Sequence, residues 1–308
     1  MSWQRYGRVF IPKPINGQGG SHAQVPTTLV YEKCIRVFYA DRNKDGKSYT
    51  TYVDLDRSDL TTVIYRHTRP ILPFGDVGAF DDDGVMPSFA LRQDGVVWLY
   101  YSGWNRGVTV PYRNSVGIAV SYDDGTTFER LFKGPVLDRT PYEPHIAVTP
   151  TIVRIDNIWR MWYISGLRWK LVNGRREPIY VIKNAHSEDG VNWMRPNKIC
   201  IPQTSNDEAF SRPSVVKDRD LYRMWFCARS SVDYCDGVGS YRIGYAESKD
   251  GDNWVRMDDK HGLPVSDDPW EMKMTCYPFV QKIDGKIVMY YNGNGFGATG
   301  FGCAILSE

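Results

Sequence analysis

Acidic side chains that could act together occur in a few polar segments of the chain. Residues 81–83 are three consecutive aspartates, and Glu143, Glu208 and Glu271 follow at wider intervals. Two carboxyl groups that face each other across a pocket can cleave a glycosidic bond, because one protonates the leaving oxygen while the other activates water or attacks directly. We predict Glu208 as the acid and Asp83 as the base or nucleophile.

Aromatic and other polar side chains occur in segments of the same kind. Tryptophan can stack on the apolar face of a sugar ring, and the arginine guanidinium group binds carboxylate or phosphate in a forked geometry. The ligand is therefore predicted to be a carbohydrate, with an anionic or nucleotide-activated sugar as an alternative. The residues predicted to bind it are Asp82, Trp104, Glu143, His145, Arg168, Arg212, Arg229, Trp270, Glu271 and Asn292.

The same residues also have structural interpretations. Asp83 could cap a turn, and Glu208 could form an ion pair with Arg212, four residues further on. Trp104 and Trp270 could fill space between neighbouring sheets instead of stacking on a sugar. Both interpretations stay open at the level of the sequence.

An internal repeat indicates which elements position these residues. A proline, an apolar strand, a short polar turn and an aromatic strand recur every 61 to 65 residues. The prolines that open the copies are Pro26, Pro87, Pro150, Pro213 and Pro278. Because sustained helical periodicity is absent, the repeat predicts an all-β fold, a five-bladed β-propeller with four-stranded antiparallel blades. The copies fill the chain, so a single domain is expected over residues 1–308.

A second signature follows the third strand of three copies. Residues 121–128, 187–193 and 248–254 each contain a serine, an aspartate, a glycine and then an aromatic residue. Aspartate accepts hydrogen bonds from nearby backbone N–H groups and glycine tolerates positive φ, so we interpret these segments as structural hairpin turns. An aromatic residue and an arginine two positions later open each fourth strand. Trp3 and Arg5 repeat that pattern, which predicts that the N-terminal strand completes blade five and closes the ring.

Loop length selects one face of the predicted propeller. The links between strands one and two, and between strands three and four, are short turns. The segments that enter strand one and those that join strands two and three are long, and in an up-and-down blade both sets emerge on the same face. Binding residues usually lie on loops carried by a rigid scaffold. We therefore predict the site in a central pocket on that face.

The overall composition argues against several classes of function. The chain has 38 Lys and Arg residues and 36 Asp and Glu residues, which gives a formal net charge of +2. A net charge this small does not indicate nucleic-acid binding. No segment is apolar enough for a membrane span or a signal peptide, and the six cysteines lack metal-ligand spacing. We expect a cytoplasmic monomer without a cofactor, with a structural calcium ion in the central channel as an alternative.

The whole chain resembles the superfamily of five-bladed propeller glycosidases, which includes the family 43 arabinanases and β-xylosidases, the invertases and levansucrases, and the mannoside phosphorylases. The matching stretches are residues 80–88, 212–226, 241–254 and 290–302. The resemblance implies a glycoside hydrolase with carboxylates one or two positions before the repeated proline. Those positions hold no acid in this chain, so the catalytic prediction falls on Asp83 and Glu208, further upstream.

Three functions compete at this point. The first is hydrolysis of a glycosidic bond by Asp83 and Glu208. The second is carbohydrate binding without catalysis, which the lack of acids before the prolines favours. The third is transfer or modification of an activated, anionic sugar, which the arginines favour.

Overall fold

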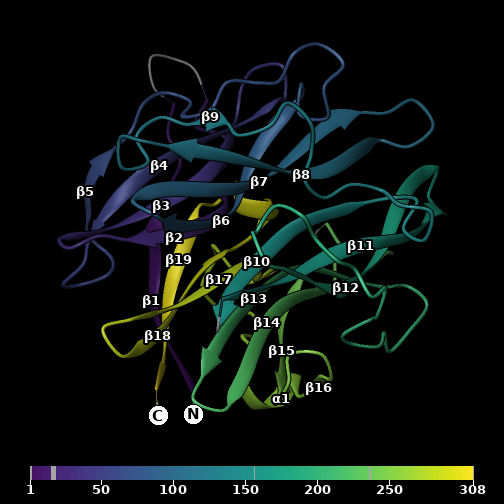
Figure 1. Ribbon diagram of the computed structural model, residues 1–308. Coiled ribbons are helices and arrows are strands. Elements are labelled where there is room, and N and C mark those ends of the chain that lie inside the picture. Colours follow the sequence, from purple (N-terminus) through teal and green to yellow (C-terminus); the bar gives the residue numbers. More distant parts are fainter. Residues whose placement is uncertain (1, 15–18, 156, 236, 308) are drawn as a thin grey trace.

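The computed structural model describes residues 2–14, 19–155, 157–235 and 237–307. Nearly all regular structure in these ranges is antiparallel β-sheet (Figure 1), as the repeat predicts. The helical segments there are two short turns, α1 (Asp258–His261) and the 3-10 turn η1 (Gly295–Gly297). No helix within these ranges is long and apolar enough to cross a membrane.

Each copy of the repeat supplies strands in the same order. The first strands, which contain the repeated proline, are β2 (Gln24–Val30), β6 (Gly84–Gln93), β10 (Ala147–Ile155), β13 (Glu208–Asp218) and β17 (Cys276–Ile283). The second strands are β3 (Cys34–Arg42), β7 (Val96–Arg106), β11 (Ile158–Val172), β14 (Leu221–Ser230) and β18 (Lys286–Asn292). The third strands are β4 (Ser48–Asp56), β8 (Tyr112–Ser121), β12 (Arg175–Ser187), β15 (Arg242–Ser248) and β19 (Phe301–Ser307). The fourth strands are β5 (Val63–Arg66), β9 (Glu129–Arg130), β16 (Val255–Arg256) and β1 (Ser2–Phe10).

Within each copy, antiparallel pairing joins the first strand to the second, the second to the third and, where a fourth strand is present, the third to the fourth. The copies that begin with β2 and β6 belong to one larger sheet, but a single parallel pair, Ser48 with Gly84, connects them. The sheet that begins with β10 has three strands, and isolated bridges extend it beyond β12, for example between His186 and Met194. A propeller-like arrangement of small antiparallel sheets results.

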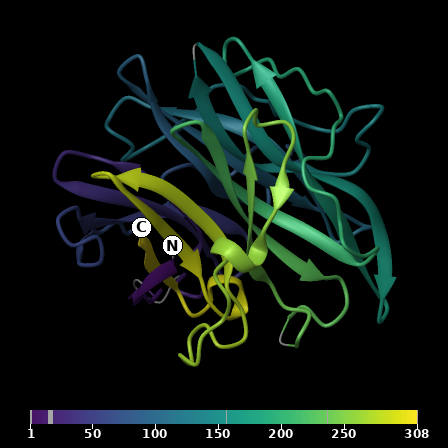
Figure 2. The same cartoon turned by 90° about the horizontal axis from the view of Figure 1, so that it is seen from below.

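The two ends of the chain pair with each other. Strand β1 lies antiparallel to β19, with Trp3 opposite Leu306 and Arg5 opposite Ala304. The N- and C-terminal ends accordingly lie side by side in both ribbon views (Figures 1 and 2). The first strands contact one another in the order β2, β6, β10, β13 and β17, and β17 also contacts β2.

Apolar clusters lie between neighbouring sheets, so that the inner strands are buried on both faces. In β13 the first nine residues are all buried. One cluster joins Trp162 of β11 to Tyr222 of β14 and to Trp254, which follows the turn after β15. All six cysteines are free thiols, and four of them are buried, whereas Cys34 is half-buried and Cys235 is exposed.

Two of the serine–aspartate turns connect third and fourth strands, as predicted, and the turn after β12 leads to the isolated bridge at Met194. The turns also form hydrogen bonds with neighbouring sheets. Asp189 accepts two backbone hydrogen bonds of 2.8 Å within its own turn. The carbonyl oxygen of Gly190 in that turn accepts a hydrogen bond of 2.7 Å from the Tyr100 hydroxyl in β7. Trp162 donates in the same way to the carbonyl oxygen of Gly251, at 2.9 Å. The turns therefore stabilise the scaffold on the side away from the long loops.

Candidate functional site

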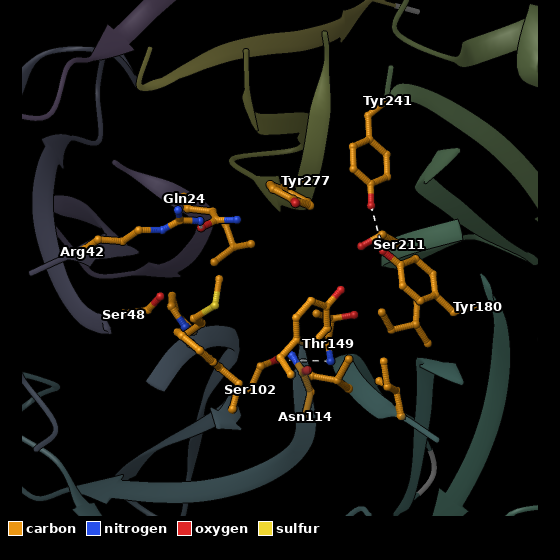
Figure 3. Close-up of a pocket in the computed structure, with 18 of the residues that line it drawn as sticks. Gln24, Arg42, Ser48, Ser102, Asn114, Thr149, Tyr180, Ser211, Tyr241 and Tyr277 are labelled. Carbon is orange, nitrogen blue, oxygen red and sulfur yellow. Dashed lines mark hydrogen bonds between the residues drawn. The ribbon is translucent and has the colours of Figure 1, made fainter. Parts of the chain in front are cut away.

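A cavity of about 310 Å³ lies between the first strands and the beginnings of the third strands. This volume is at the lower end of the range for small-molecule sites. Its aromatic lining residues are Trp104, Tyr112, Tyr180, Tyr241 and Tyr277. Its polar lining residues are Gln24, Arg42, Ser48, Ser102, Asn114, Thr149 and Ser211. Figure 3 shows Arg42 and Gln24 on one side of the open space and Tyr180 and Tyr241 on the other.

A bulge in each first strand brings the residues before the repeated prolines into the cavity wall. The pairing between first and second strands slips at this point in β2, β6, β10, β13 and β17. Val25, Thr149, Arg212 and Tyr277 have positive φ angles of 50–53° there. Such angles are uncommon for residues other than glycine, and bulges often re-aim side chains beside a site. Val25, Met86, Thr149 and Tyr277 consequently line the cavity.

Side chains of the preceding sheet hold three of these bulges in place. In each case the backbone N–H of the residue before the proline donates to an equivalent position of a second strand. The pairs are Val25 with Asn292 Oδ1 (2.9 Å), Thr149 with Ser102 Oγ (3.2 Å) and Tyr277 with Cys227 Sγ (2.8 Å). Asn292, a predicted substrate-binding residue, is fully buried in this role. It also donates to the carbonyl oxygens of Ala23 and Gly300, at 2.8 Å each.

Two tyrosine hydroxyls in the wall are oriented by a buried arginine. Arg229 is 4 % exposed and donates from Nε to the Tyr241 hydroxyl (3.2 Å) and from Nη2 to the Tyr180 hydroxyl (3.3 Å). The two hydroxyl oxygens are 3.1 Å apart. Burial by itself would lower the pKa of Arg229, but the two phenol groups hold it above its ordinary value. Because one phenol can donate to the other, one hydroxyl proton of the pair is left for a ligand.

A second buried arginine crosses the middle of the fold. Arg212, 1 % exposed, extends from β13 and donates to the carbonyl oxygens of Pro87 (3.0 Å) and Pro26 (3.1 Å) and to Thr27 Oγ1 (2.7 Å). Burial lowers the pKa of Arg212 to about 9, so the group stays charged at neutral pH. Because Pro87 lines the cavity, this positive charge lies directly behind its wall.

The two predicted catalytic acids are both engaged in ion pairs outside the lining of the cavity. Glu208 Oε1 lies 2.8 Å from Arg256 Nη1, and both residues border a separate pocket. Asp83 Oδ2 accepts the backbone N–H of Arg106 at 2.9 Å, and its other oxygen lies 3.2 Å from Lys47 Nζ. Burial acts to raise the pKa of Asp83, but the Arg106 N–H and the Lys47 ammonium outweigh it and lower that pKa. The structure does not bring Asp83 and Glu208 together.

Glu208 is one member of a repeated set of ion pairs, which we call the acid belt. Each member joins an acid near the start of a first strand to the arginine of the aromatic–x–Arg pattern in the same copy. That arginine lies in β9, β16 or β1 in three copies and in the segment after β12 in the fourth. The pairs are Asp81 with Arg130 (2.7 Å), Glu143 with Arg195 (3.1 Å), Glu208 with Arg256 (2.8 Å) and Glu271 with Arg5 (3.0 Å). Tyrosines of the second strands donate to two of these acids, Tyr101 to Asp81 and Tyr163 to Glu143. Because this ion pair recurs in four copies, we assign a structural role to all four acids, which include the predicted substrate-binding residues Glu143 and Glu271.

The remaining predicted residues have varied surroundings. Trp104 lines the cavity and is the one predicted substrate-binding residue among the described residues of its lining. His145 borders a smaller neighbouring pocket of about 210 Å³. Trp270 is 4 % exposed and belongs to an apolar cluster between the sheet of β13–β16 and the last sheet. Arg168 is exposed and donates to a backbone carbonyl at 2.6 Å, and Asp82 accepts a backbone N–H at 2.8 Å.

Several cavity residues were missed by the sequence prediction. They are mostly near the beginnings of third strands, which follow the long links: Ser48, Tyr112, Asn114, Tyr180 and Tyr241. For other cavity residues the sequence did contain a signal, namely the repeated proline, which marks the two positions before it in each copy. Those positions were set aside for lack of an acid, yet Gln24, Thr149, Ser211 and Tyr277 line the cavity from them.

Potential metal ligands do not gather in the part of the chain that the structure describes. No group of three or more His, Cys, Asp or Glu side chains with the geometry to hold an ion occurs there.

No family model matches the chain, but solved glycoside hydrolases share its fold. A putative glycoside hydrolase from Bacteroides ovatus ATCC 8483 superposes with a TM-score of 0.75 at 14 % identity, covering 99 % of this chain and 96 % of that one. A thermostable family-43 glycoside hydrolase gives 0.67 at 15 % identity, with 96 % and 92 % covered. A structure from work on the GH130 family of mannoside phosphorylases gives 0.70 at 15 % identity, with 99 % and 93 % covered. The predicted likeness to glycoside hydrolases is thus confirmed for the fold.

Sequence similarity extends over the full length of two proteins of Mycobacterium tuberculosis. "Uncharacterized protein Rv1502" of strain H37Rv and "Uncharacterized protein MT1551" of strain CDC 1551 are each 36 % identical to this chain. The match covers 100 % of this chain and 100 % of each relative. The chain therefore belongs to the family of these two mycobacterial proteins.

Proposed function

We propose that the repeats are five blades of one closed propeller domain over residues 1–308, with β1 as the last strand of blade five. The antiparallel pairing of β1 with β19 supports closure by the N-terminal strand. The contacts of each first strand with the next, including β17 with β2, support a ring around one axis. In such a ring the cavity is the axial pocket.

We further propose that this pocket binds a carbohydrate. The observation that carries the proposal is the convergence of five aromatic residues with neutral hydrogen-bonding side chains around one cavity. A sugar ring offers apolar C–H faces and a fringe of hydroxyl groups, which suit stacking rings and amide or hydroxyl partners respectively. Trp104 and Tyr277 provide rings, while Gln24, Asn114 and Ser211 provide hydrogen-bonding groups. The glycoside hydrolase fold of the solved relatives agrees with this ligand class.

Binding is tested by calorimetry of the purified protein against a panel of mono- and oligosaccharides and simple glycosides. Trp104→Ala and Tyr277→Ala are expected to weaken binding of a responsive sugar about tenfold or more, because each removes a ring from the wall. Tyr142→Ala is the matched control, since Tyr142 is 78 % exposed outside the cavity. Unchanged affinity in both cavity variants would remove the proposed site.

Hydrolysis of a glycosidic bond by Glu208 and Asp83 is the competing function, and the same panel of sugars and glycosides tests it. If they are acid and base, Glu208→Gln and Asp83→Asn each lower turnover about a hundredfold or more. The melting temperature of each variant separates lost chemistry from lost structure, because both acids form ion pairs. A loss of that size in both folded variants would establish hydrolysis by this pair. Binding without turnover supports a carbohydrate-binding role for the pocket.

A further inference from the structure

We propose that the sugar in the cavity carries a phosphate or carboxylate group, which Arg42 binds and whose charge balances that of Arg212 and Arg229. The inference rests on the proposed carbohydrate site and specifies the class of its ligand. A guanidinium group has five N–H donors in a planar fork that matches both anions.

Arg42 presents this fork to the cavity. It is the one charged residue among the described residues that line the cavity, and none of them is acidic. Arg42 Nη2 donates to Gln24 Oε1 at 3.2 Å, and no ion pair within 4.0 Å involves Arg42 among the described residues. Asp41, its neighbour in the chain, accepts the backbone N–H groups of Ser21 and His22 at 3.1 Å each.

Two further positive charges lie behind the wall. Arg212 and Arg229 are 1 % and 4 % exposed, and their hydrogen bonds go to carbonyl and hydroxyl oxygens instead of carboxylates. Burying a charge without a counter-charge is strongly unfavourable, because the charge loses its hydration and gains no opposite charge in return. The belt arginines avoid this cost, since each has a carboxylate within about 3 Å, as in the pair of Arg256 with Glu208. A ligand anion would supply the counter-charge that the cavity lacks.

The arrangement also orients the ligand. Arg42 and the pair of Tyr180 and Tyr241 lie on opposite sides of the cavity (Figure 3). An anion held by Arg42 places the attached sugar ring toward the two tyrosines. The hydroxyl proton that Arg229 leaves free on this pair can then be donated to a sugar oxygen.

Matched ligands test the inference by calorimetry at low ionic strength. The probes are neutral hexoses, the corresponding hexose phosphates and hexuronic acids, nucleotide sugars, and inorganic phosphate alone. We expect at least one anionic sugar to bind ten times more tightly than its neutral counterpart and to lose that advantage in Arg42→Gln. Arg42→Lys, which keeps the charge but not the fork, retains part of it. Arg92→Gln is the control for net charge, because Arg92 lies at the opposite end of β6 in an exposed ion pair with Asp124.

Each outcome has a distinct meaning. Equal affinity for neutral and anionic sugars, unchanged in Arg42→Gln, overturns the anion inference and leaves the carbohydrate site standing. Binding of inorganic phosphate with no gain from an attached sugar supports the anion site and overturns the carbohydrate proposal. Preference for phosphates over uronic acids, or the reverse, identifies the anion. Failure of every probe to bind overturns both proposals.

Discussion

Arginine occurs in two contrasting surroundings in this molecule. In the acid belt, Arg130 and Arg195 each lie within about 3 Å of a buried carboxylate, and the arrangement recurs from copy to copy. Around the cavity, Arg42 and Arg212 bond to neutral oxygen atoms. Most lining residues differ in type from copy to copy, although Tyr180 and Tyr241 occupy equivalent positions in two copies. The contrast teaches that arginines paired with a carboxylate in copy after copy hold the scaffold, whereas arginines that lack a carboxylate partner mark the region available for binding.

Breaking the belt should give the largest loss of stability. Glu143 is 2 % exposed and lies 3.1 Å from Arg195 and 3.3 Å from Lys183. Glu143→Gln leaves two buried cations without a counter-charge, so we expect a loss of about 3–5 kcal/mol in the free energy of unfolding, measured with urea. Glu129→Gln, at an exposed position, is the control. A loss below about 1 kcal/mol would contradict a structural belt.

The serine–aspartate turns should show a smaller effect. Asp189→Ala removes the acceptor for the backbone N–H groups of Val191 and Asn192, and we expect a loss of about 1–2 kcal/mol. The Asn192 and Val191 N–H groups, in that order, lower the pKa of Asp189 below its ordinary value of 3.8. The contribution is therefore present above that value and fades as the pH falls below it. Glu188→Ala tests the neighbouring exposed acid, and an equal loss in both variants would remove the special role of Asp189.

Arg42 should differ from the belt arginines in stability measurements. Arg42→Gln breaks no ion pair, so the free energy of unfolding is expected to change by about 0.5 kcal/mol or less. Arg195→Gln, by contrast, leaves Glu143 with one cationic partner fewer and should cost several times more. Parallel urea titrations of both variants make the comparison. Similar losses would erase the distinction between belt and cavity.

The predicted effect that is smallest at neutral pH concerns His22, near the Arg42 side of the cavity. Burial, and then the positive charge of Arg42, lower the pKa of His22 from 6.5 to about 4, although Asp41 opposes this. The unfolded chain therefore takes up a proton between pH 6.5 and pH 4 while the folded chain does not, so stability decreases as the pH falls through that window. His22→Asn should flatten this part of the profile, and the exposed His186→Asn should not. Identical profiles for the two variants would show that His22 is not the group responsible.

Particular residues show how far the sequence could predict the site. The repeated prolines located the positions whose side chains line the cavity, among them Thr149 and Tyr277, and loop length identified the correct kind of segment. The sequence did not predict the ion pair between Glu208 and Arg256. Arg256 is 48 residues away in the sequence and contacts Glu208 only after a whole sheet has formed. The aromatic–x–Arg pattern was visible, but nothing local indicated which acid it would face.

The sequence by itself determined the strand-rich repeat, the turns that separate its strands and the all-β class of the fold, since each depends on local patterns of apolar, turn-forming and proline residues. Only the tertiary structure decided which polar groups share a space. It assigned the acids to the belt and placed Arg42 and the tyrosines around the cavity (Figure 3). The reason is physical, because burial and charge pairing arise between residues of different sheets, and the energy of a buried arginine depends on whether such a partner is present.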